Sequence, residues 1–294
     1  MATRNSSLRL VSPVWLVLIG ILSVQFGASV AKSTFDQAGP TTVVWLRLAT
    51  SALLLVAVAR PVLRGRSRED WYVVLGFGVS LGVMNWSFYQ AFARIPLGVA
   101  VTLEFLGPLT LAVVLSRRLR DLLWVALAGL GIALLGLSGL SGGGSLTVAG
   151  VAFALLAGAC WAAYILLSVQ TGRRWPGFDG LAVASVVAAL LLLPAAVGVG
   201  AHDLADPRIL VLGAVVGLLS SVIPYSCELV ALRSIAPAAF SILMSLEPAA
   251  AALAGMLVLG EFLTAAQWVA MACVVVASVG ATRSSRVVAQ PVPD

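Results

Sequence analysis

The feature that most constrains the fold of this chain is its division into ten long apolar runs separated by short polar breaks. The runs lie near residues 13–32, 41–59, 71–91, 96–115, 121–138, 149–170, 179–200, 208–231, 237–259 and 264–282. A membrane-spanning helix needs about 20 mostly apolar residues, and each run is close to that length. The runs are continuous, whereas the strands of a transmembrane β-barrel alternate apolar and polar residues. The pattern predicts an all-α polytopic membrane protein with ten transmembrane helices.

The composition excludes a water-soluble globule and several kinds of site. Only 10% of the 294 residues are charged, too few to cover a water-facing surface. The net charge of +6 would suggest a nucleic-acid partner in a soluble chain, but membrane topology accounts for the Arg excess, so we expect no nucleic acid. The cysteines form no CxxC pair and the only lysine, Lys32, follows no glycine-rich turn. We therefore expect no metal, no cofactor and no ATP-hydrolysing P-loop.

The basic residues predict the orientation of the helices. With a cytoplasmic N-terminus, 14 Lys and Arg residues fall in inside segments and 3 fall outside, in agreement with the positive-inside rule. The three outside residues are Lys32, Arg94 and Arg208. Both termini should therefore be cytoplasmic. The first run also resembles a cleavable signal peptide, but its removal would leave nine spans and weaken this charge bias, so we expect it to be retained.

An internal similarity appears when the chain is shifted by 140 residues. The shift brings Pro108 onto Pro248 and Leu106 onto Leu246. Each half then holds five helices, and because five is odd, the second copy inserts upside down. Inverted repeats are typical of secondary transporters, whose substrate site lies near the midplane. Chance similarity between two Ala/Leu/Gly-rich sequences is the alternative.

The repeat predicts the organisation of the whole chain. We expect a cytoplasmic N-terminal tail at 1–12, a first five-helix repeat at 13–140, a Gly-rich linker at 141–148, a second five-helix repeat at 149–282 and a disordered cytoplasmic tail at 283–294. Small residues recur at four-residue spacing, as in Gly78/Gly82 and Gly213/Gly217. Such pairs let helix backbones approach closely, so we interpret them as packing surfaces.

Four ionisable residues lie within the apolar runs: Arg47, Glu104, Glu228 and Glu247. Each costs about 2.5–3.5 kcal/mol if it is charged at the bilayer centre. Under the 140-residue shift Glu104 maps one helical turn from Glu247, and both lie near the middle of their runs. One interpretation is a polar pathway in which a carboxylate exchanges protons during transport. The other is a structural role, such as an Arg47–Glu104 ion pair or a protonated Glu bonded to a carbonyl.

Prolines and amphipathic residues also lie within the runs. Pro108, Pro224 and Pro248 each free a backbone carbonyl one turn earlier. We interpret them as simple kinks, with a broken, substrate-ligating helix as the alternative. The amphipathic residues are Asn85, Tyr89, Trp161, Tyr164 and Tyr225. They either shape a pocket for a small solute or pack with one satisfied hydrogen bond each.

Several strings resemble the threonine and homoserine exporters of the drug/metabolite transporter superfamily, which carry EamA-type repeats. In the first half these are GVSLGVMN at 78–85 and LEFLGPL at 103–109. In the second half they are PYS at 224–226, MSLEPA at 244–249 and LGE at 259–261. The Glu-Pro and Leu-Gly-Glu elements indicate only the superfamily, whereas the strings around Glu104 and Tyr225 are more specific. The resemblance covers about residues 15–282.

The resemblance implies ten helices in two inverted five-helix halves around a central cavity, in a bacterial inner membrane. We expect a secondary active exporter of small amino acids, threonine or homoserine first, driven by proton antiport with alternating access. A zwitterionic substrate needs one basic and one acidic partner, which Arg47 with Glu247 or Glu104 would supply. Alternatives are an exporter of another metabolite or drug, or a non-transporting scaffold. An enzyme is not expected, because there is no HExxH motif and no second histidine beside His202. Nothing in the sequence indicates an oligomeric state.

Overall fold

The first half of the chain forms helices in the order of the apolar runs. The computed structural model describes residues 12–116, 122–140, 146–232 and 237–284, and these ranges contain helices and no β-strand. The helices up to residue 140 are α1 (Pro13–Ser33), α2 (Pro40–Ala59), α3 (Arg68–Phe92), α4 (Leu97–Glu104), α5 (Leu106–Ser116) and α6 (Leu122–Leu140). The single run expected at 96–115 is thus divided into α4 and α5.

The second half follows a similar order. Its elements are α7 (Val148–Arg174), α8 (Asp179–Gly200), the short 3-10 turn η2 (Asp203–Ala205), α9 (Pro207–Gly217), the π-helical segment η3 (Leu218–Val222), α10 (Ile223–Leu232), α11 (Pro237–Met244), α12 (Glu247–Ala254), the π-helical segment η4 (Gly255–Leu259) and α13 (Ala265–Ser284). The expected tails and most of the expected linker at 141–148 lie outside the described residues.

The all-α polytopic class is confirmed. Among the described residues, nine helical stretches are long and apolar enough to cross a membrane. The tenth expected run, 121–138, coincides with α6, which has 19 residues. The helices begin where their sequences favour a start. Proline opens α1 and α2, where its missing N–H is not needed.

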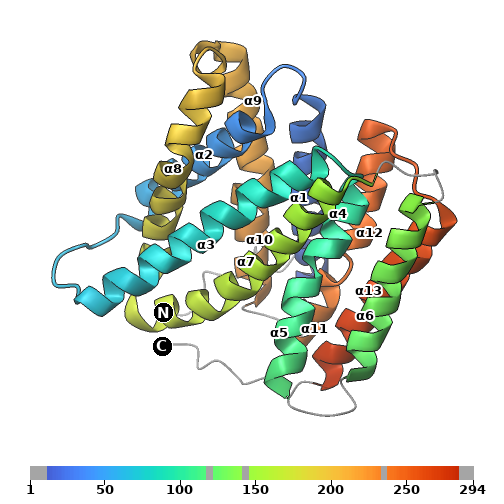
Figure 1. The fold of residues 1–294 in the computed structure, drawn as a ribbon. Helices are drawn as coiled ribbons and strands as arrows, with labels where there is room; N and C mark the ends of the chain where they lie inside the picture. The colour runs from blue at the N-terminus through green and yellow to red at the C-terminus, as the bar shows by residue number, and fades with distance from the viewer. Residues whose placement is uncertain (1–11, 117–121, 141–145, 233–236, 285–294) are drawn as a thin grey trace.

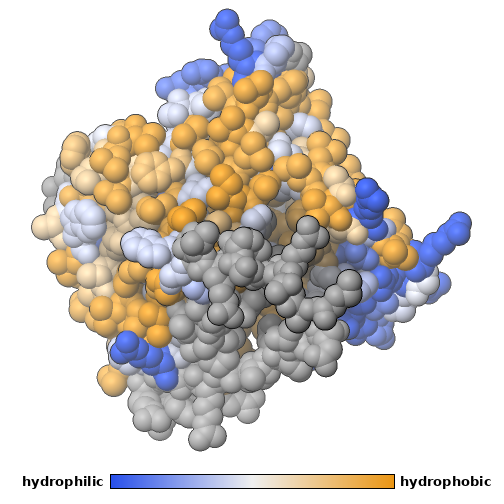
Figure 2. Space-filling model, turned by 180° about the vertical axis from the view of Figure 1, so that it is seen from behind, coloured by the Kyte–Doolittle hydropathy of each residue, from blue (hydrophilic) through white to orange (hydrophobic). Residues whose placement is uncertain are grey.

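The helices expose apolar side chains on the outer surface of the molecule, as expected for a protein that faces lipid. Leu53, Val58 and Leu123 are each more than two-thirds exposed and lie on helices. Figure 2 shows hydrophobic residues over most of the coloured part of one face, with hydrophilic residues gathered toward its ends. A soluble protein of this size rarely exposes so continuous an apolar surface.

The helices pack in pairs that join distant parts of the sequence. In Figure 1, α3 runs along α7, and α6 lies beside α13. The expected small-residue surfaces are real packing surfaces. A Cβ on Gly82 of α3 would lie 3.2 Å from the Ala188 Cα of α8, and one on Gly217 of α9 would lie 2.8 Å from the Thr50 Cβ of α2. Both glycines therefore permit a close helix crossing.

Candidate functional site

Three helix interruptions lie beside the three prolines of interest. The helix α4–α5 is interrupted at Phe105, three residues before Pro108, and α11–α12 is interrupted at Ser245 and Leu246, just before Pro248. Pro224 follows the π-helical segment η3. A proline offers no N–H to the carbonyl four residues earlier. The carbonyls that lose this donor are those of Glu104, Ser220 and Met244.

One freed carbonyl is bound by an arginine from another helix. The Nη2 of Arg47, on α2, donates a hydrogen bond of 3.1 Å to the backbone oxygen of Ser220. The same guanidinium lies 5.7 Å from the ring centroid of Tyr89 on α3. We call Arg47, Tyr89 and Ser220 the Arg47 cluster. It joins α2, α3 and η3, which come from both halves of the sequence.

Two acids flank the other interruptions. Glu104 is the last residue of α4 and Glu247 is the first residue of α12, and both are buried. The charge of Glu104 interacts with those of Arg47 and Glu247. Glu228, on α10, is partly buried and interacts with Glu247. The structure therefore places Glu104 within electrostatic reach of both Arg47 and Glu247, and Glu228 within reach of Glu247.

These charges are not held in direct ion pairs. The ion pairs within 4 Å in the described part of the chain are Lys32–Glu261, Arg66–Asp179, Arg174–Glu69 and Arg174–Asp70. The Arg47–Glu104 pair, which the sequence left open as a structural alternative, is absent from this set. Without such a partner, a buried charge is costly unless a cavity or a ligand solvates it.

Helix α7 lines the interruption between α4 and α5. The ring of Trp161 packs edge-on against Phe105, with centroids 5.1 Å apart. A Cβ on Gly158 would lie 2.6 Å from the backbone oxygen of Glu104, so only glycine permits this approach. The backbones of Gly107 and Gly158 also meet here. The interruption is thus held by a close helix crossing.

The other amphipathic residues that the sequence singled out make contacts of their own. The Nδ2 of Asn85 donates a hydrogen bond of 2.9 Å to the Leu81 oxygen of its own helix. The ring of Tyr164 packs against Phe77 at 5.0 Å. The side chain of Tyr225 lies outside the described residues. Among the described residues, no group of three or more His, Cys, Asp or Glu is placed to hold a metal ion.

The interpretation of the sequence missed several buried polar side chains, Gln25 and Ser220 among them. Gln25, on α1, is 2% exposed, and its Oε1 has no hydrogen-bond partner. The rule that singled out the buried acids, a polar group within an apolar run, also applies to Gln25. Ser220 is also 2% exposed. Its position four residues before Pro224 was the available signal.

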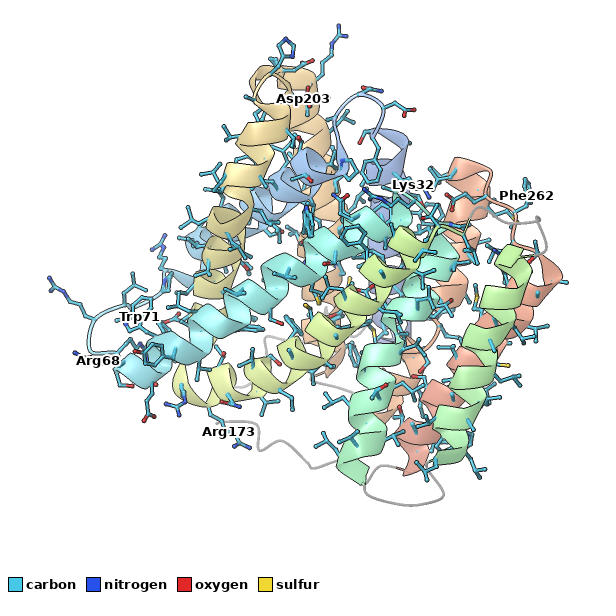
Figure 3. The ribbon with its side chains drawn as sticks, viewed as in Figure 1. Lys32, Arg68, Trp71, Arg173, Asp203 and Phe262 are labelled. Carbon is cyan, nitrogen blue, oxygen red and sulfur yellow. The ribbon has the colours of Figure 1, made fainter. Side chains whose placement is uncertain are left out.

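A separate set of contacts joins α1, α4 and the segment after η4 at one end of the molecule. The Lys32 Nζ at the end of α1 forms a 2.5 Å ion pair with Glu261 and donates a 2.9 Å hydrogen bond to the Ile95 oxygen. The second carboxylate oxygen of Glu261 accepts a 2.8 Å hydrogen bond from the Leu97 N–H at the start of α4. Figure 3 shows Lys32 at the same end as Asp203 and Phe262, whereas Arg68, Trp71 and Arg173 lie at the opposite end.

Comparisons with known proteins agree with this architecture. Residues 148–283 match the EamA-like transporter family. The threonine/homoserine exporter RhtA of Salmonella typhimurium strain LT2 is 42% identical over 93% of this chain and 94% of its own length. Its counterpart in Escherichia coli K12 is 41% identical with the same coverage. A solved crystal structure with 20% identity has a TM-score of 0.58 over 94% of this chain and 99% of its own, which shows a shared fold.

The membrane-spanning helices and these matches identify a polytopic transporter of the EamA type. Within that class, the chain belongs to the family of the threonine/homoserine exporter RhtA.

Proposed function

We propose that this protein exports small amino acids, threonine and homoserine first, from the bacterial cytoplasm across the inner membrane. The observation that carries the proposal is that Glu104, buried beside one helix interruption, lies within electrostatic reach of the partly buried Arg47 and of the buried Glu247, in a chain 41–42% identical to named threonine/homoserine exporters. A free amino acid carries one carboxylate and one ammonium group. The guanidinium of Arg47 is suited to the first, and the carboxylate of Glu104 or Glu247 is suited to the second.

The same acids support proton antiport as the mechanism. In a low-dielectric site, a carboxylate that has no fixed ion-pair partner can bind either a proton or a substrate ammonium group. Glu247 lies at the start of α12, beside an interruption where the two parts of the helix can change their relative angle. Exchange of a proton for the substrate at this carboxylate would couple export to the proton gradient.

Alternating access needs two halves that move against each other. The 140-residue repeat is supported by helix bounds: α4 spans Leu97–Glu104 and α11 spans Pro237–Met244, so both ends are offset by 140 residues. The contacts between helices also agree with this 140-residue offset. Helix α3 crosses α8 through Gly82, and its equivalent α9 crosses α2 through Gly217. These matches support two inverted five-helix halves around a central cavity.

Glu247→Gln tests the proposed role of the carboxylate. In proteoliposomes, we expect the wild-type protein to move labelled threonine against an imposed pH gradient. In the variant, the rate of this gradient-driven transport should fall by about tenfold or more, because an amide cannot exchange a proton. Cells carrying the wild-type protein should also tolerate excess homoserine, and the variant should lose that tolerance while still inserting.

Glu69→Gln is the matched control, because the same change is made at an exposed carboxylate in the first turn of α3. Normal export by Glu247→Gln would remove Glu247 from the mechanism. Absence of threonine and homoserine transport by the wild-type protein, with transport of another solute, would assign the protein a different cargo.

A further inference from the structure

The short helices α4 and α11, which the 140-residue shift relates, differ in how far they are covered. The shift carries α4 onto α11 residue by residue, because their bounds are Leu97–Glu104 and Pro237–Met244. All eight residues of α4 are buried. On α11, each side chain that the structure describes is partly exposed: Phe240, Ile242, Leu243 and Met244. Equivalent helices therefore have unequal surroundings in the two halves.

The contacts of these two helices explain the difference. Helix α4 packs against α12, and a Cβ on Gly98 of α4 would lie 2.9 Å from the Ala252 Cβ of α12. The shift carries α5 onto α12, so the equivalent of this contact is one between α11 and α5. Among the described residues, α11 and α5 make no comparable contact. An inverted repeat places the two interfaces at opposite ends of the molecule, and only the interface at the start of α4 is closed.

The closed end is held by a polar contact that we call the outer clip, which consists of Lys32, Glu261 and the turn at residues 95–97. Lys32 lies at the end of α1 and Glu261 follows η4, and α1 and η4 pack together. Both side chains bind the turn that begins α4, through the Ile95 oxygen and the Leu97 N–H. They are 17% and 18% exposed, so water reaches the clip. A hydrated ion pair is weak enough to open and close during a transport cycle.

We propose that the outer clip is the periplasmic gate of the transporter, closed in this structure, and that its opening releases the exported amino acid. The proposal rests on the proposed function and assigns named residues to one step of it. The distribution of basic residues predicts that Lys32 lies at the periplasmic end, so the end at which α11 and α5 are apart is the cytoplasmic one. An exporter receives its substrate in this state. In the opposite state, α4 separates from α12 and α11 packs against α5.

A reversible cross-link tests whether this gate must open. A Cβ on Gly255 of η4 would lie 3.7 Å from the Leu97 Cβ, a separation that suits a disulfide. The double variant Leu97→Cys/Gly255→Cys is made in a chain whose three native cysteines are replaced by alanine. Oxidation should lower threonine transport in proteoliposomes by about tenfold or more, because the locked outer end cannot open. A reductant should restore transport.

Gly20→Cys with Cys227 retained is the matched control, because a Cβ on Gly20 would also lie 3.7 Å from the Cys227 Cβ. This pair joins α1 to α10, and the equivalent helices α7 and α3 pack together as well, so this interface does not differ between the halves. Its oxidation should leave transport unchanged. Unchanged transport after oxidation of the Leu97–Gly255 pair would overturn the gate and leave the proposed export intact, and so would an equal loss in the control. Failure of the wild-type protein to move threonine would overturn the proposed function, and the gate with it.

A labelling assay tests the gate without measuring transport. In the chain without native cysteines, Gly255→Cys alone places a buried reporter at the outer end. Adding Lys32→Gln removes the positive charge of the clip, so labelling by a membrane-impermeant maleimide in intact cells should become about fivefold faster. Adding Asp36→Asn instead changes an exposed charge four residues away and should leave the rate unchanged. An unchanged labelling rate with Lys32→Gln would overturn the gate.

Discussion

At the scale of single residues, Gly158 determines how closely α7 approaches the interruption after Glu104. A Cβ at this position would meet the Glu104 oxygen and the Gly107 backbone, neither of which is a flexible side-chain end that could move aside. Gly172, in the same helix, has no atom within 4 Å of the place where its Cβ would be. The two glycines therefore lie in the same helix, but only Gly158 is in a close contact with another helix.

Gly158→Ala should destabilise the protein, by about 1–3 kcal/mol, because the added methyl forces the two backbones apart. Gly172→Ala should be neutral or slightly stabilising, because alanine favours the helix and meets nothing. Thermal unfolding of the two purified variants in detergent provides the comparison. If both variants unfold at the wild-type temperature, the close approach of α7 does not contribute to stability.

The sequence could predict which residues carry charge inside the membrane, but not what they contact. Glu104 and Glu247 stand out because ionisable side chains are rare in apolar runs. The Arg47 contact with Ser220 depends on how α2 meets η3, and no local pattern encodes that packing. Ser220 itself resembles any other small residue in an apolar run. Its role depends on a proline one turn later and on an arginine 173 residues away.

At the scale of the elements, the apolar pattern located the helices well. The run expected at 179–200 coincides with α8, Asp179–Gly200. Helix α3 begins at Arg68, before the run expected at 71–91, because Ser67 and Asp70 form a capping box that extends the helix through charged residues. The breaks within 96–115 and 237–259 lie beside Pro108 and Pro248, where we expected kinks and kept a broken helix as the alternative. Apolar composition alone continues across both breaks.

Glu261 connects three elements, so its loss should affect stability in two separable steps. Glu261→Gln removes the ion pair with Lys32 but keeps an oxygen for the Leu97 N–H, and we expect a loss of about 1 kcal/mol. Glu261→Ala also leaves the Leu97 N–H without its acceptor, and should cost about 1–3 kcal/mol more. Thermal unfolding is measured for both variants, for Lys32→Gln alone and for Lys32→Gln combined with each of them. The comparison gives the coupling energy between Lys32 and Glu261.

Asp36→Asn is the control for this series, because Asp36 is exposed and forms none of the ion pairs found in the described part of the chain. It should leave the unfolding temperature unchanged. Additive effects of Lys32→Gln and Glu261→Gln would show that the ion pair contributes nothing to stability.

At the scale of the whole molecule, the two connections that the 140-residue shift relates lie at opposite ends. The connection between α2 and α3 covers residues 60–67, and the 140-residue shift carries it onto 200–207, between α8 and α9. Figure 3 shows Arg68, beside the first connection, at one end, and Asp203, in the second, at the other. An inverted repeat produces this arrangement, because an odd number of helices reverses the direction of the second copy.

This geometry predicts which loops face the cytoplasm. The connection 60–67 carries Arg60, Arg64 and Arg66, and such residues favour the cytoplasmic side. After replacement of Cys160, Cys227 and Cys273 by alanine, a single cysteine at Asp203 should react with a membrane-impermeant maleimide in intact cells. A single cysteine at Arg68 should react only after the membrane is permeabilised. Labelling of both positions from outside would contradict the inverted arrangement, and the reverse pattern would place both termini outside.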